Sequence, residues 1–199
     1  MKDRPERSSE RRPGSGLQQG CCRCLSSLLL LGSVVFFLTA ARAQTGTPRE
    51  YELKAVWLYN LLKFVDWPSD VLSPQSEAFT IGILGDSQFG EALDRLREKT
   101  IKGKNILVKH LAGPSDGRDC QIIFICVSEK ERLPQILETL KRTRVLTVGE
   151  TAGFAEEGGI ANLIAERNRV RLEINNSAAS RSGLTISSQL LNVATLKDS

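Results

Sequence analysis

Three glycines surround a predicted strand-to-helix turn, where a phosphate-binding loop would be found. Gly82 lies inside the predicted strand, and Gly85 and Gly90 follow it. The glycines do not form G-x-G-x-x-G. Gly85 and Gly90 have the gap of G-x-x-x-x-G-K-[ST], but Glu91 occupies the position of the lysine. A carboxylate at that position would repel a phosphate group. We therefore expect a structural turn here rather than a nucleotide site.

Residues that could catalyse a reaction are few and do not form a known arrangement. His110 is the only histidine, and it ends a predicted strand. No G-x-S-x-G motif surrounds any serine, and the paired acids Glu156 and Glu157 precede two glycines in a turn-rich segment. We expect that the protein is not an enzyme.

Arginines alternate through a predicted strand near the C-terminus. Arg167, Arg169 and Arg171 are each two residues apart, a spacing that places side chains on one face of a strand. Such a face could bind an anion or an acidic partner, and Arg169 and Arg171 are our candidate ligand-binding residues. The alternative is a polar, solvent-exposed face of the sheet, on which Glu166 and Glu173 balance the charges of the arginines.

Two of the five cysteines, Cys120 and Cys126, flank an apolar run that is typical of a buried strand. Six strand steps separate them by about 20 Å, which is too far for a disulfide bond within the chain. We expect two buried thiols. One histidine cannot complete a typical metal cluster, so we expect neither a metal site nor a cofactor.

The most apolar segment that could position these residues runs from Glu50 to Trp67 and precedes Pro68. Twelve of the seventeen residues from Tyr51 to Trp67 are apolar or aromatic. A helix that is apolar on most sides is either central to the core or in contact with a second chain. Both alternatives remain open at this point. The candidate residues for a partner or dimer interface are Tyr51, Trp57, Leu58 and Leu61.

The rest of the chain alternates short apolar strands with helices, which predicts an α/β fold. The predicted strands are Phe79–Leu84, Asn105–His110, Gln121–Val127 and Val145–Val148. Helices are predicted at Gln88–Lys99, from Ser128 as N-cap to Arg142, at Ser177–Ser182 and at Ser187–Leu196. Ile160–Glu166 and Arg169–Ile174 predict an antiparallel hairpin. We expect a single compact domain with a mostly parallel sheet flanked by helices, a C-terminal β-hairpin and short terminal helices.

The N-terminal segment carries the whole excess of positive charge. Residues 1–43 hold seven of the 27 basic and three of the 23 acidic residues, which leaves 20 of each in residues 44–199. A neutral domain argues against nucleic-acid binding. The uncharged run Leu25–Ala41 leads into Ala41-Arg42-Ala43, an ending typical of a cleaved signal peptide. We expect a signal peptide at 1–43, a mature domain at 44–199 and export to the periplasm; the alternative is a retained membrane anchor.

Five segments, in order along the chain, resemble the YfiR-like family of periplasmic proteins. They contain the motifs F-V-x-W-P, G-F-x-x-x-G-G and I-N-x-x-A-A-x-x-x-G-L-x-I-S-x-x-L-L. The segments are Lys54–Pro68, Ile81–Gly90, Cys120–Ile125, Val148–Leu163 and Val170–Leu191. Each motif is weak alone, but together the segments span nearly the whole predicted mature chain, in order.

The resemblance implies a regulator without catalytic activity and a compact α/β domain that tends to dimerise. The implied partner is the periplasmic domain of an inner-membrane diguanylate cyclase, whose c-di-GMP synthesis the protein would repress. An OmpA-like outer-membrane lipoprotein is the implied second partner. The resemblance also implies a role in ligand binding for Arg171. The alternative function is a small-molecule or anion sensor that acts on a histidine kinase or an outer-membrane transporter.

Two positions depart from the family pattern. The family's best-known member responds to redox conditions through disulfides, but Ile81–Leu84 and Val148–Gly159 contain no cysteine here. Cys120 matches a cysteine position of the family but lacks its partner. Leu172 replaces the usual phenylalanine, a conservative change in an apolar side chain.

Overall fold

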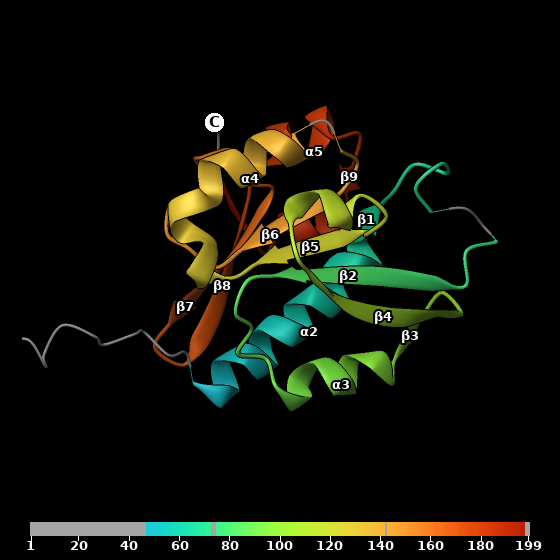
Figure 1. Ribbon diagram of the computed structural model, residues 1–199, viewed down its shortest axis with the longest axis horizontal. Helices are drawn as coiled ribbons and strands as arrows, with labels where there is room; N and C mark the ends of the chain where they lie inside the picture. The colour runs from blue at the N-terminus through green and yellow to red at the C-terminus, as the bar shows by residue number, and fades with distance from the viewer. Residues whose placement is uncertain (1–46, 73–74, 142, 198–199) are drawn as a thin grey trace, which may run out of the picture. The chain divides into compact units, whose positions relative to one another are not determined.

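An eight-stranded sheet forms the centre of the domain (Figure 1). The computed structural model describes residues 47–72, 75–141 and 143–197. The predicted signal peptide lies outside these residues. Along the sheet the strand order is β10-β8-β7-β6-β5-β2-β4-β3, and a separate two-stranded sheet joins β1 to β9.

The described residues form ten strands, five α-helices and two 3₁₀-helices. The strands are β1 (Val65–Asp66), β2 (Ala78–Leu84), β3 (Thr100–Ile101), β4 (Lys104–Leu111), β5 (Ile122–Ile125), β6 (Leu146–Gly149), β7 (Ala161–Glu166), β8 (Arg169–Ile174), β9 (Thr185–Ile186) and β10 (Thr195–Leu196). The α-helices are α2 (Pro48–Phe64), α3 (Glu91–Arg97), α4 (Leu133–Leu140), α5 (Asn176–Arg181) and α6 (Ser188–Leu191). Two 3₁₀-helices are η1 (Pro114–Gly117) and η2 (Val127–Arg132).

The pairing pattern confirms the predicted fold class. Strands β4, β2, β5, β6 and β7 are parallel to their neighbours in that order. The predicted hairpin is present, because β7 pairs antiparallel with β8 along its whole length, from Ala161 opposite Ile174 to Glu166 opposite Arg169. Helices α2 and α3 cover one face of the sheet and α4 lies over the other (Figure 1).

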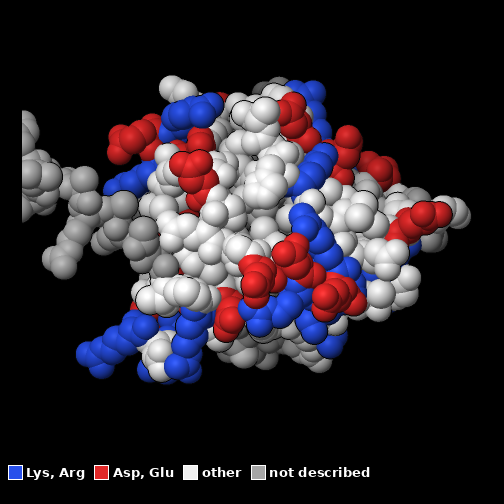
Figure 2. Space-filling view, turned by 60° about the horizontal axis from the view of Figure 1, so that its bottom comes forward, with Lys and Arg blue, Asp and Glu red and all other residues white. Residues whose placement is uncertain are grey.

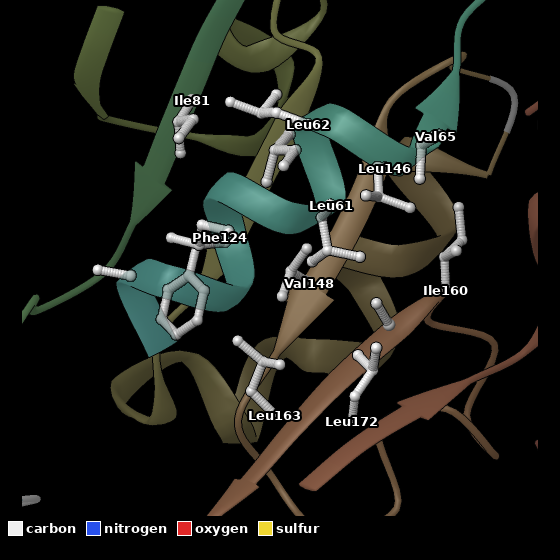
Figure 3. Close-up of a cluster of buried hydrophobic side chains, with 14 of the residues drawn as sticks. Leu61, Leu62, Val65, Ile81, Phe124, Leu146, Val148, Ile160, Leu163 and Leu172 are labelled. Carbon is white, nitrogen blue, oxygen red and sulfur yellow. The ribbon is translucent and has the colours of Figure 1, made fainter. Parts of the chain in front are cut away.

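Helix α2 is the centre of the larger apolar core. Of the two alternatives left open by the sequence, a helix central to the core is therefore the one that applies to its buried side. Its N-cap Thr47 accepts a hydrogen bond from the backbone N–H of Glu50, and Pro48 begins the helix. Leu61 and Leu62 are completely buried and point toward the strands (Figure 3). Around them lie apolar side chains of β2, β5, β6, β7 and β8, among them Ile81, Phe124, Leu146, Val148, Leu163 and Leu172.

The C-terminal boundary of α2 differs from the prediction. The helix ends at Phe64 instead of continuing to Trp67, because Val65 pairs with Ile186 of β9. The carbonyl of Phe64 accepts the N–H of Ser187 in the same short ladder. Strand pairing with a distant segment, rather than Pro68, therefore ends the helix.

Three other boundaries also differ. The helix predicted at Gln88–Lys99 covers only Glu91–Arg97. The one predicted at Ser187–Leu196 stops at Leu191, and β10 follows it. Ser128 does not cap a long helix, since it lies within η2 and its Oγ accepts the N–H of Asp86. Helix α4 begins later, at Leu133.

Candidate functional site

Three polar side chains meet inside the domain beneath the first turns of α2, and we call them the Lys54–Glu150 cluster. The hydroxyl of Tyr51 donates to Oε2 of Glu150 at 3.0 Å, and Lys54 Nζ lies 2.6 Å from the same oxygen. The other oxygen, Oε1, accepts the N–H of Val127 at 2.8 Å. Lys54 also forms an ion pair with Glu50 one helical turn earlier. The carboxylate of Glu150 thus joins α2 to the segment that follows β5.

Burial dominates the electrostatics of this cluster. The side chains of Lys54 and Glu150 are each only 3% exposed. Burial, reinforced by the charge of Glu150, raises the pKa of Tyr51, so its hydroxyl remains a donor at any physiological pH. The same two causes raise the pKa of Cys126 to about 12. Cys126 and Cys120 are both free and buried, as predicted, and Cys126 stays protonated.

The cluster lies where ligands commonly bind in folds of this kind. Glu150 follows β6 and Val127 follows β5, so both lie at the carboxyl ends of parallel strands. Open α/β sheets usually bind ligands outside this edge. Here the side chains of α2 cover that part of the edge, and the buried charges neutralise one another.

The glycines after β2 form a closed turn, as the sequence predicts. Gly85 has φ +93°, a conformation that favours glycine. A Cβ on this residue would lie 2.5 Å from Oγ of Ser128, which accepts the N–H of Asp86. The side chain of Ser128 therefore fills the space beside this turn.

The glycine-rich segment between β6 and β7 wraps around one aromatic ring. Phe154 is completely buried. A Cβ on Gly149 would lie 2.3 Å from its ring, and a Cβ on Gly159 would lie 2.0 Å from it. Gly153 and Gly158 have φ values of +85° and +101°. The motif G-F-x-x-x-G-G thus encodes a tight loop in which glycines leave room for a phenylalanine.

Arg171, the residue that the resemblance links to a ligand, is held by the protein's own acids. Its Nε lies 2.6 Å from Glu166, and its Nη1 lies 2.6 Å from Glu173. Glu173 is buried and also accepts a hydrogen bond from Asn162 at 3.1 Å. Lys197 approaches the same carboxylate at 3.7 Å. An anion at Arg171 would have to compete with two carboxylates.

Arg169 lies in a different environment, at the end of the molecule where the β7–β8 turn meets the start of α2. It is exposed and forms no ion pair with an acid among the described residues. Arg167, in the turn itself, and Arg49 of α2 line the same small hollow. Basic side chains gather at one end of the view in Figure 2, while acidic and basic groups mix over its central part. Arg169 and Arg171 thus lie two residues apart on β8 but have different neighbours.

Three of the four predicted interface residues lie in the interior of the domain. Tyr51 is 3% exposed, and Leu58 and Leu61 are completely buried. Trp57 is partly buried, and its Nε1 donates to the carbonyl of Val170 at 3.2 Å. Apolar residues at helical spacing pack on the sheet, so the side of α2 that these three residues occupy faces the core. A partner or dimer interface on α2 stays a prediction, for the outer side of the helix.

That outer side contains a hollow of about 520 Å³ between α2 and α3. Small side chains lie at its floor, because Ala55 of α2 and Ala92 of α3 both line it and are both buried. Val56 is 56% exposed at its margin, and the exposed ion pair between Arg95 and Glu52 lies alongside at 2.9 Å. The hollow thus combines an apolar floor with a charged rim. Sequence spacing could not reveal it, since it depends on how α3 packs.

Two negative findings apply to the described part of the chain. Residues 47–72, 75–141 and 143–197 contain no group of three or more His, Cys, Asp or Glu side chains that could hold a metal ion. None of the helices in these ranges combines the length and the hydropathy that a membrane span requires.

Solved structures resemble the chain only distantly. They include a conserved domain protein of Vibrio cholerae O1 biovar El Tor, with 15% identity, TM-score 0.47 and coverage of 73% of this chain and 60% of that one. A Streptococcus pneumoniae ABC domain in complex with L-Trp has 13% identity, TM-score 0.46 and coverage of 75% and 60%. A ligand-free, open substrate-binding protein with adhesive properties from Clostridium difficile has 11% identity, TM-score 0.43 and coverage of 66% and 57%.

The chain therefore spans about 60% of each of those proteins, and TM-scores below 0.5 carry no conclusion on its ligand or partner. No curated protein sequence matches the chain significantly. A family model does match, over residues 51–195, which is most of the chain and includes Lys54, Glu150 and the whole glycine-rich loop. This chain belongs to the YfiR/HmsC-like family.

Proposed function

We propose that this protein is a periplasmic regulator that binds the periplasmic domain of an inner-membrane diguanylate cyclase and so lowers c-di-GMP synthesis. Membership of the YfiR/HmsC-like family over residues 51–195 carries the proposal. Regulation would work through protein contact, without a catalytic step and without a cofactor. An OmpA-like outer-membrane lipoprotein would relieve repression by sequestering the regulator.

We place the contact with the cyclase at the hollow between α2 and α3. Helices in regulators commonly receive partner side chains in such grooves, with an apolar floor and a polar rim. The exposed Val56 and the buried Ala55 and Leu96 supply the apolar part here, and Arg95 and Lys99 supply charge. The contact would use the side of α2 that faces α3, and Tyr51, Leu58 and Leu61 do not line that hollow.

Replacing Val56 with Asp is expected to weaken binding to the cyclase at least 10-fold. The substitution puts a charge on an apolar surface that the partner would cover, and tenfold corresponds to about 1.4 kcal/mol. The measurement is the dissociation constant between the exported protein and the receptor, which is first captured from detergent-solubilised membranes. Circular dichroism should show an unchanged fold, since Val56 is exposed.

Leu107→Asp is the matched control, because Leu107 is 55% exposed but lies on β4, away from the hollow. It should bind the cyclase as the wild type does. Equal binding by Val56→Asp and wild type would remove the hollow from the contact. Capture of a histidine kinase or an outer-membrane transporter instead of a cyclase would contradict the proposed function and favour the sensor alternative.

The sensor alternative relied on Arg169 and Arg171 as one anion-binding face. The two guanidinium groups have different surroundings, because Arg171 is paired with Glu166 and Glu173 while Arg169 is exposed. An anion sensor would therefore use Arg169 with Arg167 and Arg49 around their small hollow. No contact among the described residues favours this function over the repressor.

A further inference from the structure

Three exposed arginines of the described chain lie around the turn that joins β7 to β8, and we call them the turn arginines. Arg167 lies in the turn itself, Arg169 begins β8, and Arg49 lies in the first turn of α2. All three line the same small hollow. Figure 1 shows the start of α2 beside the hairpin, so the fold brings together basic residues that are far apart in the sequence.

No acidic side chain of the described chain neutralises the turn arginines through an ion pair. Glu50 also lines the hollow, but its carboxylate is paired with Lys54. Glu166, the last residue of β7, is paired with Arg171. Residues 44–199 contain equal numbers of acidic and basic residues, so the turn arginines form a local excess of positive charge on a domain without net charge. Basic groups gather accordingly at one end of the view in Figure 2.

The shape of the hollow favours a broad anionic surface over a single small ligand. Its volume is about 20 Å³, which is room for little more than one water molecule. The guanidinium groups therefore do not enclose a ligand, and because they are exposed their N–H donors are accessible from outside. Arginine binds phosphate groups through two N–H donors at a time. A surface on which many phosphates lie side by side can engage all three arginines at once.

The same end of the domain follows the predicted export segment. Thr47, the N-cap of α2, lines the hollow together with the turn arginines. Ala41, where the uncharged run ends, is six positions before Thr47, a distance of at most about 20 Å along an extended chain. The sequence adds one more positive charge here: Arg42 if the run is retained as an anchor, or the α-amino group of Gln44 if it is cleaved. Both alternatives therefore strengthen the positive charge at this end.

We propose that the turn arginines attach the domain to an anionic phospholipid membrane. Their guanidinium groups pair with lipid phosphates, and Leu53, which lines the same hollow and is partly buried, adds an apolar side chain beside them. Each arginine strengthens attachment about 5-fold, the equivalent of about 1 kcal/mol near an anionic surface. Three such contributions give a reversible attachment that orients the domain rather than anchoring it. Attachment to lipid is independent of which receptor the protein regulates, so it extends beyond the proposed function.

Co-sedimentation of the exported protein with lipid vesicles tests this attachment. At low ionic strength the wild type should sediment with phosphatidylglycerol vesicles but not with phosphatidylcholine vesicles. Raising the salt concentration to about 0.5 M should release it, because exposed charges are then screened. The triple substitution Arg49→Gln, Arg167→Gln and Arg169→Gln should lower the partition coefficient about 100-fold, the product of three 5-fold losses.

The matched control removes the same amount of charge from the opposite side of the sheet. Lys63 lies in the last turn of α2, Lys102 lies in the turn before β4, and Arg118 lies before β5. All three are exposed. The triple substitution Lys63→Gln, Lys102→Gln and Arg118→Gln should reduce sedimentation far less than the loss of the turn arginines does. Circular dichroism should show the same fold in both variants. Equal losses in the two variants would overturn the proposal, because net charge and not this surface would then decide binding.

A second readout locates the surface directly. Asn168→Cys places a thiol in the turn between Arg167 and Arg169, and Asn105→Cys places one on an exposed residue at the start of β4. The other cysteines of residues 44–199, Cys120 and Cys126, are buried and stay outside the reaction. An environment-sensitive fluorophore should shift its emission on phosphatidylglycerol vesicles when it is attached at position 168, but not at position 105.

Inorganic phosphate distinguishes a lipid surface from a free anion. Added at constant ionic strength, it should not displace the wild type from the vesicles. A wild type that stays in solution with phosphatidylglycerol vesicles would overturn the proposal, including the case in which calorimetry shows that the turn arginines bind inorganic phosphate instead. Sedimentation that the loss of the turn arginines leaves unchanged would overturn it as well.

Discussion

Lys54→Ala is expected to lower the free energy of unfolding by about 3–5 kcal/mol, the cost of leaving a buried charge without its partner. The charge left behind is that of Glu150, whose side chain is 3% exposed. Tyr51 and the N–H of Val127 would remain as donors to this carboxylate, but neither carries a positive charge. Denaturant unfolding of the variant and the wild type gives the difference.

The reverse substitution and a double variant separate charge from packing. Glu150→Ala should destabilise the domain by a similar amount, because it leaves Lys54 buried with only the partly exposed Glu50. Replacing both, as Lys54→Met with Glu150→Leu, should cost less than the sum of the two single changes, since neither Lys54 nor Glu150 is left as a buried charge without its partner, although Tyr51 and the N–H of Val127 lose their acceptor. Lys63→Ala, on the exposed side of the same helix, is the control and should change stability by less than about 0.5 kcal/mol. A loss below about 1 kcal/mol for Lys54→Ala would contradict the role of the pair.

Phe154→Ala is expected to cost about 3–5 kcal/mol, because it empties the space that the β6–β7 loop encloses. The ring is completely buried, and Gly149 and Gly159 lie on either side of it. Removing the ring therefore leaves a cavity that two backbone segments without side chains cannot fill. Thermal or denaturant unfolding measures the loss.

Adding a side chain at a glycine of this loop tests the same packing around Phe154 in the opposite sense. Gly159→Ala should destabilise by about 1–3 kcal/mol through overpacking, because the new Cβ would lie 2.0 Å from the ring. Gly158→Ala is the comparison. Its Cβ would meet nothing within 4 Å, so its cost should be only the 1–2 kcal/mol of a positive φ in a residue with a side chain. If Gly159→Ala is partly rescued by Phe154→Leu, the two positions are coupled as the packing requires. Additive effects of the two substitutions would contradict this contact.

Hydrophobic runs were sufficient to predict the centre of the sheet and the hairpin. Residues of β5 are completely apolar and buried, and the alternation in β8 places Val170, Leu172 and Ile174 in the core. Strands β1, β3, β9 and β10 have two residues each, which is too short for any periodicity to appear in the sequence. The end of α2 could not be predicted for the same reason, because it depends on pairing between Val65 and Ile186.

The Lys54–Glu150 cluster joins residues that are 96 positions apart. In the sequence, each of the two charges taken alone resembles a solvated side chain. Because the two residues are so far apart along the chain, their pairing cannot be predicted from the sequence. One signal was present nevertheless: Lys54 follows Tyr51 by three residues and precedes Leu58 by four, which places a charge on the buried stripe of a helix. A charge in that position requires a buried partner. The arginine alternation was correct as a pattern but could not show that Glu166 and Glu173 hold Arg171.

The most direct test of the regulatory role is the cellular c-di-GMP concentration with and without this protein. Deleting the gene should raise c-di-GMP, and restoring the exported chain should return it to the original level. The rise should disappear when the captured diguanylate cyclase is deleted too. An unchanged c-di-GMP concentration after deletion of the regulator, under conditions in which it is produced, would contradict the account.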